Sequence, residues 1–349
     1  MVRIGIVGIG FMGMIHYLAS AKVAGGQVRA ICSRDPKKLA GDWTSIQGNF
    51  GPKGTQVDVS HLARYTSIDE MLADPEIDLV DLCVPSDEHA GWTIKALEAG
   101  KHVLVEKPIA LNAADADAML AAAKASGKML MVGHVLPYFP EFAYAQKLVE
   151  SGEYGKLRAA HFTRVITKPD WSSGTAEVER SGGPVVDLHI HDNHYIGLVC
   201  GVPRAVHSRG VVDQGTVVHL ITQYLYDDPN LAVSALSGAL SQPGRPFAHV
   251  FEIYLERATI SFEFMNLAGQ GHLATPLSVI LPDGTVDRPD LRGSGDPIEA
   301  FEAELSAAVE AVATGQPCAT LSGELAARAL KLCHAEIESV KTGKTVSIF

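Results

Sequence analysis

The pattern of apolar and polar positions divides the chain into two parts with different periodicities. Up to about residue 150, short apolar runs alternate with segments in which apolar residues recur at helical spacing. The runs lie at residues 4–7, 28–32, 79–84, 103–105 and 129–132. Strands that alternate with helices in this way favour an α/β fold with a doubly wound parallel sheet.

The second part of the chain has strand-like runs that follow one another with only turn residues between them. They lie at residues 157–167, 206–212, 217–226, 231–240, 249–255 and 258–264, and helical patterns follow at 296–313 and 324–341. Successive strands without intervening helices indicate one antiparallel sheet. The sequence therefore predicts two domains, residues 1–136 and residues 137–349.

One segment of the first domain fits neither pattern. Residues 41–66 are rich in Gly, Pro, Thr and Ser, and their length exceeds that of an ordinary connection. We expect a surface excursion that forms an ordered flap or an interface element within this domain.

The composition restricts the partners of the protein. The formal net charge is −11, without a long Lys/Arg run, which argues against a nucleic-acid partner. No apolar run approaches the roughly 18 residues that a membrane span needs. The five cysteines are widely spaced without a C-x-x-C, as in proteins with reduced thiols. A first strand that begins at residue 2 leaves no room for a signal peptide, so we expect a cytoplasmic protein.

A glycine motif follows the first apolar run directly. Residues 8–13 read GIGFMG, a G-x-G-x-x-G, and a helical pattern comes next. In this context Gly8 permits a tight turn, Gly10 lets a pyrophosphate approach the backbone, and Gly13 lets helix and strand pack closely. The helix N-terminus then offers N–H groups to the phosphates. We predict a dinucleotide site formed by Gly8, Gly10, Phe11, Met12 and Gly13; the alternative is a glycine-rich turn that binds nothing.

The end of the second strand indicates which dinucleotide binds. Ser33, Arg34 and Asp35 stand about twenty residues after the last glycine, where the adenosine ribose is expected. A guanidinium suits a 2′-phosphate, and Ser33 adds a small donor. Asp35 precedes Pro36 and can instead cap the helix that begins there. We predict contacts from Ser33 and Arg34 and a slight preference for NADP over NAD.

Polar residues also follow the third and fourth strands of the predicted parallel sheet. Ligands bind at the carboxyl ends of such strands, so Pro85, His89, Glu106 and Lys107 are predicted to contact the cofactor. His89 can contact the nicotinamide ribose or the substrate, or serve only at the surface or as a cap. Pro108 restricts the backbone of the preceding Lys107, so we expect the lysine to have a fixed orientation.

The second domain contains a segment with several chemically active side chains. In residues 181–194, Asp187 and His191 are four positions apart, so a helix places both on one face and His189 on another. Asp187 can alternatively be a helix cap and His191 a packed core histidine. His189, His191, Asp192 and His194 are metal-ligand types, but without the H-E-x-x-H or C-x-x-C spacing we predict no metal.

Three motifs together resemble a known family. These are the G-x-G-x-x-G, Glu106-Lys107-Pro108, and the glycine-rich lead into Asp187-x-x-x-His191. In this order they are similar to the glucose–fructose oxidoreductase, inositol dehydrogenase and rhizopine-catabolism (Gfo/Idh/MocA) oxidoreductases, over essentially the whole chain. The resemblance implies a Rossmann domain and then an α/β domain with an open, mostly antiparallel sheet. It also implies assembly as dimers or tetramers through that sheet, and a catalytic set of Lys107, Asp187 and His191.

The chemistry of these side chains agrees with the resemblance. Oxidation of a secondary alcohol needs a base for the hydroxyl proton, and histidine suits this role near neutral pH. Lys107 can stabilise a developing alkoxide, Asp187 can orient the donor, and a nicotinamide carries the hydride. We predict an NAD(P)-dependent oxidoreductase that acts on a sugar, cyclitol or related polyol. A glycoside-cleaving enzyme that retains its cofactor and a non-catalytic dinucleotide sensor are the alternatives.

Further polar and aromatic residues leave strand ends or flank the catalytic segment. Such a mixture suits a polyhydroxylated ring. The predicted substrate contacts are His134, Tyr138, Lys168, Trp171, His189, Asn193 and His194. Tyr138 and Trp171 can equally be interface or core aromatics.

Overall fold

The chain folds into two compact units. The computed structural model describes all residues except 49, 168–177, 179, 241, 243, 292, 294 and 349. The first unit comprises residues 1–139 and 293–327, and the second comprises residues 140–292 and 328–349. The first division falls close to the expected boundary. The return of residues 293–327 to the first unit differs from the contiguous second domain that the sequence analysis expected.

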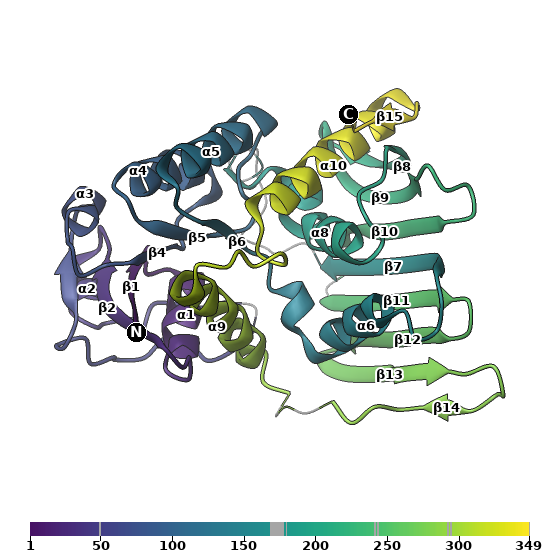
Figure 1. Cartoon of the computed structure of the whole chain (residues 1–349), viewed down its shortest axis with the longest axis horizontal. Coiled ribbons are helices and arrows are strands. Elements are labelled where there is room, and N and C mark those ends of the chain that lie inside the picture. The colour runs from purple at the N-terminus through teal and green to yellow at the C-terminus, as the bar shows by residue number, and fades with distance from the viewer. Residues whose placement is uncertain are drawn as a thin grey trace. The chain divides into compact units, whose positions relative to one another are not determined.

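The first unit contains a parallel sheet with the strand order β3-β2-β1-β4-β5-β6 (Figure 1). Its described strands are β1 (Val2–Val7), β2 (Gly26–Cys32), β3 (Ala63–Tyr65), β4 (Leu79–Leu82), β5 (His102–Glu106) and β6 (Leu130–Gly133). The order reverses between β1 and β4, which is the switch point where doubly wound sheets bind ligands. The predicted α/β sheet is confirmed. The sequence missed β3, because Ala63-Arg64-Tyr65 has no apolar run.

Helices α1 to α5 follow the strands of this sheet as the periodicity predicted, and α9 joins them from later in the chain. They are α1 (Phe11–Ser20), α2 (Pro36–Leu39), α3 (Ile68–Leu72), α4 (His89–Glu98), α5 (Ala113–Ser126) and α9 (Ile298–Thr314), with short 3₁₀ turns at Ser86–Glu88 and Leu136–Tyr138. Asn112 caps α5 by accepting the Asp115 N–H at 2.9 Å.

Helix α9 explains why residues 293–327 belong to the first unit. Phe301, Leu305, Ala308 and Val309 form one apolar stripe, and all four are buried in the same core as Ile15 of α1. Figure 1 shows α9 beside α1. The sequence predicted this helix. Its periodicity shows which face is apolar, but it does not show which part of the protein that face packs against.

Residues 41–66 are ordered around buried apolar side chains. Trp43 is completely buried, and Ile46, Val59 and Leu62 join it in the core of the first unit. The Trp43 indole Nε1–H donates to the Lys38 carbonyl at 2.8 Å. The segment is therefore an ordered part of the first unit, and its apolar side chains belong to the core of that unit.

The second unit is built on a sheet of nine strands among the described residues. The order is β14-β13-β12-β11-β7-β10-β9-β8-β15, and all neighbours are antiparallel except β10 and β7. The strands are β7 (Leu157–Thr167), β8 (Ala205–Asp213), β9 (Thr216–Leu225), β10 (Ala232–Leu240), β11 (Phe247–Leu255), β12 (Thr259–Leu267), β13 (Gln270–Ile280), β14 (Val286–Asp287) and β15 (Val346–Ser347). The mostly antiparallel sheet is confirmed. The sequence analysis missed β13, whose apolar residues do not form a continuous run and most of whose positions are exposed.

Aromatic side chains hold helices of the second unit against this sheet. The helices are α6 (Pro140–Ser151), α8 (Ile190–Val199) and α10 (Gly323–Thr342), of which α10 belongs to this unit from Arg328 on. A π-helical turn at Val185–His189 precedes α8. Phe142 of α6 contacts Tyr195 of α8 and Phe251 of β11, each with ring centroids 5.0 Å apart. This packing fixes α8, which carries part of the predicted catalytic segment.

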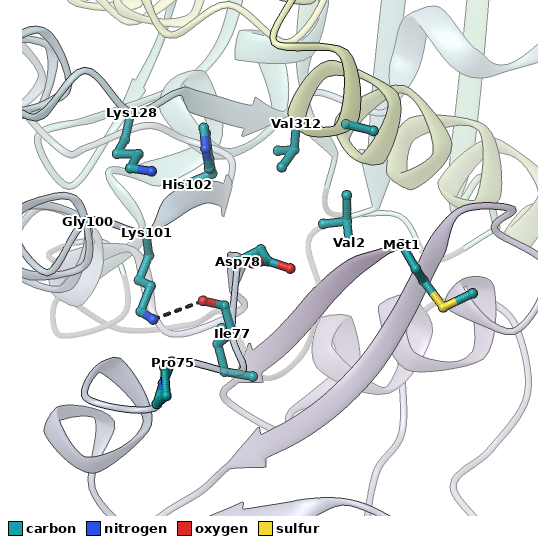
Figure 2. Close-up of a pocket in the computed structure, with 11 residues that line it drawn as sticks. Met1, Val2, Pro75, Ile77, Asp78, Gly100, Lys101, His102, Lys128 and Val312 are labelled. Carbon is teal, nitrogen blue, oxygen red and sulfur yellow. Dashed lines mark hydrogen bonds between the residues drawn. The ribbon is translucent and has the colours of Figure 1, made fainter.

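A cavity of about 520 Å³ opens at the amino ends of the strands in the first unit (Figure 2). Val2, Asp78 and His102 line it, at the edge of the sheet opposite the glycine turn. Lys101 also lines it, and its Nζ donates to the Asp74 and Ile77 carbonyls at 2.6 and 2.9 Å. This lysine therefore joins backbone segments, and the cavity lies away from the predicted cofactor residues.

Two simpler expectations concern the whole described chain. No helix among the described residues is both long and apolar enough to span a membrane. The five cysteines, all within the described residues, are free thiols.

Candidate active site

The glycine turn after β1 has the geometry that a dinucleotide requires. Gly8 has a φ of +91°, and a Cβ there would lie 2.6 Å from the Cys83 carbonyl oxygen. A Cβ at Gly13 would collide with the Gly8 carbonyl oxygen. At Gly10, the N-cap of α1, a Cβ would meet no described atom within 4 Å. The turn thus leaves open space in front of the α1 amino end, which fits a pyrophosphate.

The side chains of Phe11 and Met12 pack inward beside this turn. Both are half-buried against the core of the first unit, and the Phe11 ring lies 4.9 Å from that of Phe50. Any contact with phosphates would therefore come from their backbone N–H groups, since these side chains are engaged in packing.

Three neighbouring residues at the end of β2 have different contacts. Asp35 caps α2 and accepts the Lys37 N–H at 2.9 Å, so the capping alternative is confirmed. The Ser33 hydroxyl accepts the Asp35 N–H at 3.2 Å. The Arg34 side chain is 81% exposed, and its guanidinium donates to Glu88 at 3.0 Å.

His89 connects the loops that follow β4 and β5. It is buried, with Nδ1 2.7 Å from the Pro108 carbonyl oxygen and Nε2 3.0 Å from that of Val84. Burial lowers the pKa of His89, which favours the neutral ring. His89 was expected to contact cofactor or substrate, whereas its ring nitrogens face the backbone of these loops. Pro85 is half-buried in the first of them.

Lys107 follows the end of β5, where buried polar side chains hold its backbone. Lys107 is half-buried, and its N–H donates to Glu106 Oε2 at 3.2 Å. Glu106 Oε1 lies 2.9 Å from His16 Nε2, and His16 Nδ1 lies 2.9 Å from Asp81 Oδ2. The peptide bond to Pro108 is cis. The sequence analysis overlooked His16 and Asp81, although a charged residue inside the apolar run LVDLCV was a usable signal.

The segment around residues 185–194 presents only part of its polar surface. Asp187 on the π-helical turn and His191 on α8 are half-buried. Four polar neighbours are buried, namely His189, Asp192, Asn193 and His194. Asp187 and His191, which were predicted to share a helix face, are thus more exposed than the four polar residues around them.

A buried network occupies the polar atoms behind this segment. His189 Nε2 lies 3.0 Å from Glu336 Oε1, and the Asn193 amide donates to Glu336 Oε2 at 2.7 Å. Tyr224 donates to Asn193 Oδ1 at 2.7 Å. His189 and Asn193 were expected to contact substrate, but these bonds direct both side chains to α10 and β9.

Charged partners determine the protonation of this network. Burial alone lowers the pKa of His189, but the Glu336 and Asp192 carboxylates outweigh it and raise that pKa to about 9. Burial also opposes the charge of Asp192, yet the guanidinium of Arg164, whose Nε lies 2.9 Å away, and His189 lower its pKa to about 2. His189 is therefore protonated and Asp192 ionised at neutral pH.

The other predicted substrate contacts have different surroundings. His134 in the first unit and His194 in the second are buried. Tyr138 packs against the core of the first unit with its hydroxyl 3.7 Å from Cys318 Sγ, and burial raises the pKa of this phenol. Lys168 and Trp171 lie outside the described residues.

Two family models match the chain. Residues 2–134 match the model described as an oxidoreductase family with an NAD-binding Rossmann fold. Residues 142–261 match the GFO/IDH/MocA C-terminal domain.

Known proteins align with the chain over different lengths. It is 32% identical to the uncharacterized oxidoreductase ORF334 of Rhizobium meliloti over 55% of the chain, but the match spans only about half, 54%, of that relative. It is 26% identical to the 1,5-anhydro-D-fructose reductase of Ensifer adhaerens over 99% of the chain and 98% of that protein.

The fold also occurs in a solved structure. An oxidoreductase from Agrobacterium radiobacter, in complex with NAD+, L-tartaric acid and magnesium, matches with a TM-score of 0.80 and 21% identity. The match covers 99% of this chain and 98% of that one.

Proposed function

The chain belongs to the Gfo/Idh/MocA oxidoreductase family, and on this basis we propose that it transfers a hydride between a nicotinamide dinucleotide and a CH–OH group. The proposed substrate is a sugar, cyclitol or related polyol. The sugar-reductase name of the Ensifer relative supports this substrate class. The open space at Gly10 supports the cofactor.

The observation that carries the proposal is the exposure pattern of residues 185–194. A histidine that only stabilised the core would be enclosed, as His189 is. Asp187 and His191 remain half-buried in a segment whose neighbouring polar side chains are enclosed, as residues that act on a ligand must. We propose that His191 accepts the hydroxyl proton during oxidation and that Asp187 orients the proton donor.

Lys107 has the third role in this reaction. Its backbone is fixed by Glu106, and its ammonium group would donate to the oxygen that becomes an alkoxide during hydride transfer. The cofactor, when bound, supplies the hydride acceptor. Lys107, Asp187 and His191 thus form the proposed catalytic set.

We propose that NADP binds somewhat more tightly than NAD. The capping role of Asp35 supports this preference, because a carboxylate held by the α2 backbone is directed away from a 2′-phosphate. Arg34 is the exposed cation at this strand end, and Ser33 lies beside it. Glu88 opposes the preference, since it competes with the phosphate for the Arg34 guanidinium.

The proposed set of substrate-contacting residues is smaller than the set predicted from the sequence. Lys168, Trp171, His134, Tyr138 and His194 stay in the proposal. His189 and Asn193 leave it, because substrate would have to displace their bonds to Glu336.

We also propose a homodimer or homotetramer formed through the open face of the large sheet. Ile221 of β9 stands between the buried Leu220 and Thr222, so it lies on the opposite face, and it is 53% exposed. Leu273 of β13 is equally exposed. Apolar side chains of this size in solvent are typical of an association surface.

The direct test identifies any nucleotide that co-purifies with the protein and then screens polyols for a change at the nicotinamide absorbance. Substrate-dependent reduction of added NADP or NAD is the expected result. Failure of every sugar and cyclitol would contradict the proposal. Glycoside cleavage without net formation of NAD(P)H would replace it with the cofactor-retaining alternative.

A further inference from the structure

A continuous line of buried polar contacts runs beneath the end of β5. Asp81 of β4 contacts His16 of α1 at 2.9 Å, and His16 contacts Glu106 of β5 at 2.9 Å. The other Glu106 oxygen accepts the backbone N–H of Lys107 at 3.2 Å. All three linking side chains are buried. Rigid elements of the sheet and α1 are thereby connected to the backbone from which the Lys107 side chain projects.

The geometry around His16 fits an imidazolium. His16 Nδ1 is hydrogen-bonded to Asp81, whereas Nε2 lies 2.9 Å from Glu106 Oε1 as an ion-pair contact without hydrogen-bond alignment. Two carboxylates this close to the ring favour its charged form. Burial opposes this charge, yet the Asp81 carboxylate holds the pKa of His16 well above its usual value. The groups that face the ring are Asp81 of β4, Cys83 just after β4, Glu106 of β5, and Glu304 of α9. His16 is therefore charged and held on two sides.

Glu304 is the unusual member of this cluster. It is completely buried, and neither carboxyl oxygen has a hydrogen-bond partner among the described residues. A Cβ at Gly133 would lie 3.2 Å from Glu106 Oε1 and 3.3 Å from Glu304 Oε1, so both carboxyl groups approach the same backbone position. Burial and the neighbouring Glu106 raise the pKa of Glu304 well above its usual value. Because the raised pKa favours the neutral form of Glu304, Glu106 is the carboxylate that pairs with His16 on this side of the ring.

A second contact holds the other side of the same short segment. The carbonyl oxygen of Pro108 lies 2.7 Å from Nδ1 of His89. The Lys107-Pro108 dipeptide is thus held at its N–H by Glu106 and at its last carbonyl by His89. Two separate side chains therefore hold this stretch of two residues.

We propose that His16, held by Asp81, is a positioning residue for Lys107 and acts through Glu106. This inference rests on the proposed function, which gives Lys107 its role at the reacting oxygen. Catalysis requires such a group to be held in place closely, and an error near 1 Å costs about a hundredfold in rate. The network supplies that constraint without contacting the substrate.

The kinetic test compares His16→Gln and Asp81→Asn with Thr93→Val. Thr93 is a buried polar residue of the first unit outside the network and serves as the matched control. We expect kcat to fall by about tenfold to hundredfold in the first two variants, with little change in polyol KM or cofactor Kd. Thr93→Val should keep the wild-type kcat. Wild-type kcat in both network variants, or equal losses in all three, would overturn the proposal.

Two readouts are independent of turnover. Hydrogen exchange should become faster at the Lys107 amide in folded His16→Gln and stay unchanged in the α5 helix. The ¹⁵N spectrum of His16 should show both nitrogens protonated at pH 7 in the wild type and lose this signature in Asp81→Asn. A neutral His16 in the wild type, or unchanged exchange at Lys107, would contradict the network itself. If both signatures are present but Lys107→Met turns over normally, the proposed function fails instead.

A bound cation is the competing explanation for this cluster. One atom each of His16, Glu106 and Glu304 lie within 4.8 Å of one another, a grouping that can hold a metal ion. Elemental analysis of the purified protein, with Glu304→Gln as the comparison, separates the two. Absence of a stoichiometric metal supports the network of ion pairs and hydrogen bonds. One equivalent of a divalent ion that disappears in Glu304→Gln would overturn it.

Discussion

Asp35 accepts the backbone N–H of Lys37 at 2.9 Å and so caps the helix that follows β2. The carboxylate at the strand end, which would otherwise mark an NAD site, is thereby directed to the α2 backbone. Arg34, one position earlier, is exposed and paired with Glu88. We therefore propose the Arg34 guanidinium as the group that discriminates between the two dinucleotides.

The Arg34→Ala variant should lose affinity for NADP selectively. A charge-assisted contact of about 1.5–3 kcal/mol corresponds to about a tenfold to hundredfold change in Kd. Titration of both cofactors against wild type and variant measures this effect, with the neighbouring cation variant Lys37→Ala as control. Equal or tighter binding of NAD by the wild type would show that Arg34 does not set the preference.

The Lys107→Met variant should lower turnover by about a hundredfold to a thousandfold, because the donor to the developing alkoxide is lost. Cofactor affinity should remain near that of the wild type. Steady-state kinetics and cofactor titration together measure the two effects. Lys128→Met is the matched control, since Lys128 lines the cavity at the opposite edge of the sheet. A normal kcat in Lys107→Met would remove Lys107 from the catalytic set.

The His191→Ala variant should lose most of the dependence of alcohol oxidation on pH. An imidazole must be neutral to accept a proton. The rate of alcohol oxidation by the wild type should therefore rise with pH as the His191 ring becomes neutral. The pH profile of kcat/KM is the measurement, and the exposed His161→Ala is the control. An active variant with an unchanged profile would assign the base to another group.

The Glu304→Gln variant should weaken the dependence of stability on pH. The pKa of Glu304 is raised in the folded state above the ordinary 4.5, so the wild-type free energy of unfolding should fall as pH rises above about 4.5. Glutamine stays neutral and removes this component. The raised pKa of His16 adds a separate fall above about 6.5, which should persist. Urea midpoints between pH 5 and 8 measure the difference, and equal slopes in both proteins would contradict a protonated Glu304.

The Glu336→Gln variant should destabilise the second unit by about 3–5 kcal/mol, because His189 then carries a buried charge with a weaker partner. The loss should be largest below pH 9, where His189 is charged in the wild type. Denaturant unfolding measures it. Glu338→Gln, at an exposed position on the same helix, should change stability little. A comparable loss in both variants would show that α10 is sensitive to any such change.

The sequence could predict local structure and motif residues but not the partners that support them. Strands, helices and the candidates Lys107, Asp187 and His191 depend on short-range patterns. Glu336 contacts His189 across 147 positions of the chain, and no periodicity relates them.

The burial of individual polar residues was equally inaccessible to sequence analysis. His189 and His191 are two positions apart and chemically identical, yet one faces Glu336 and the other remains half-buried. The π-helical turn at Val185–His189 ends at the first of these histidines and shifts the helical phase there, and an ideal helical wheel does not contain that shift.

The return of residues 293–327 to the first unit has a consequence for biosynthesis. During translation, residues 1–139 emerge before α9, so the surface of α1 that α9 covers stays uncovered until residues 140–292 have also been made. A gene fragment that ends at residue 139 would express an unfinished nucleotide-binding unit with its apolar side in solvent. An excised version should therefore join residue 139 to residues 293–327 through a short linker.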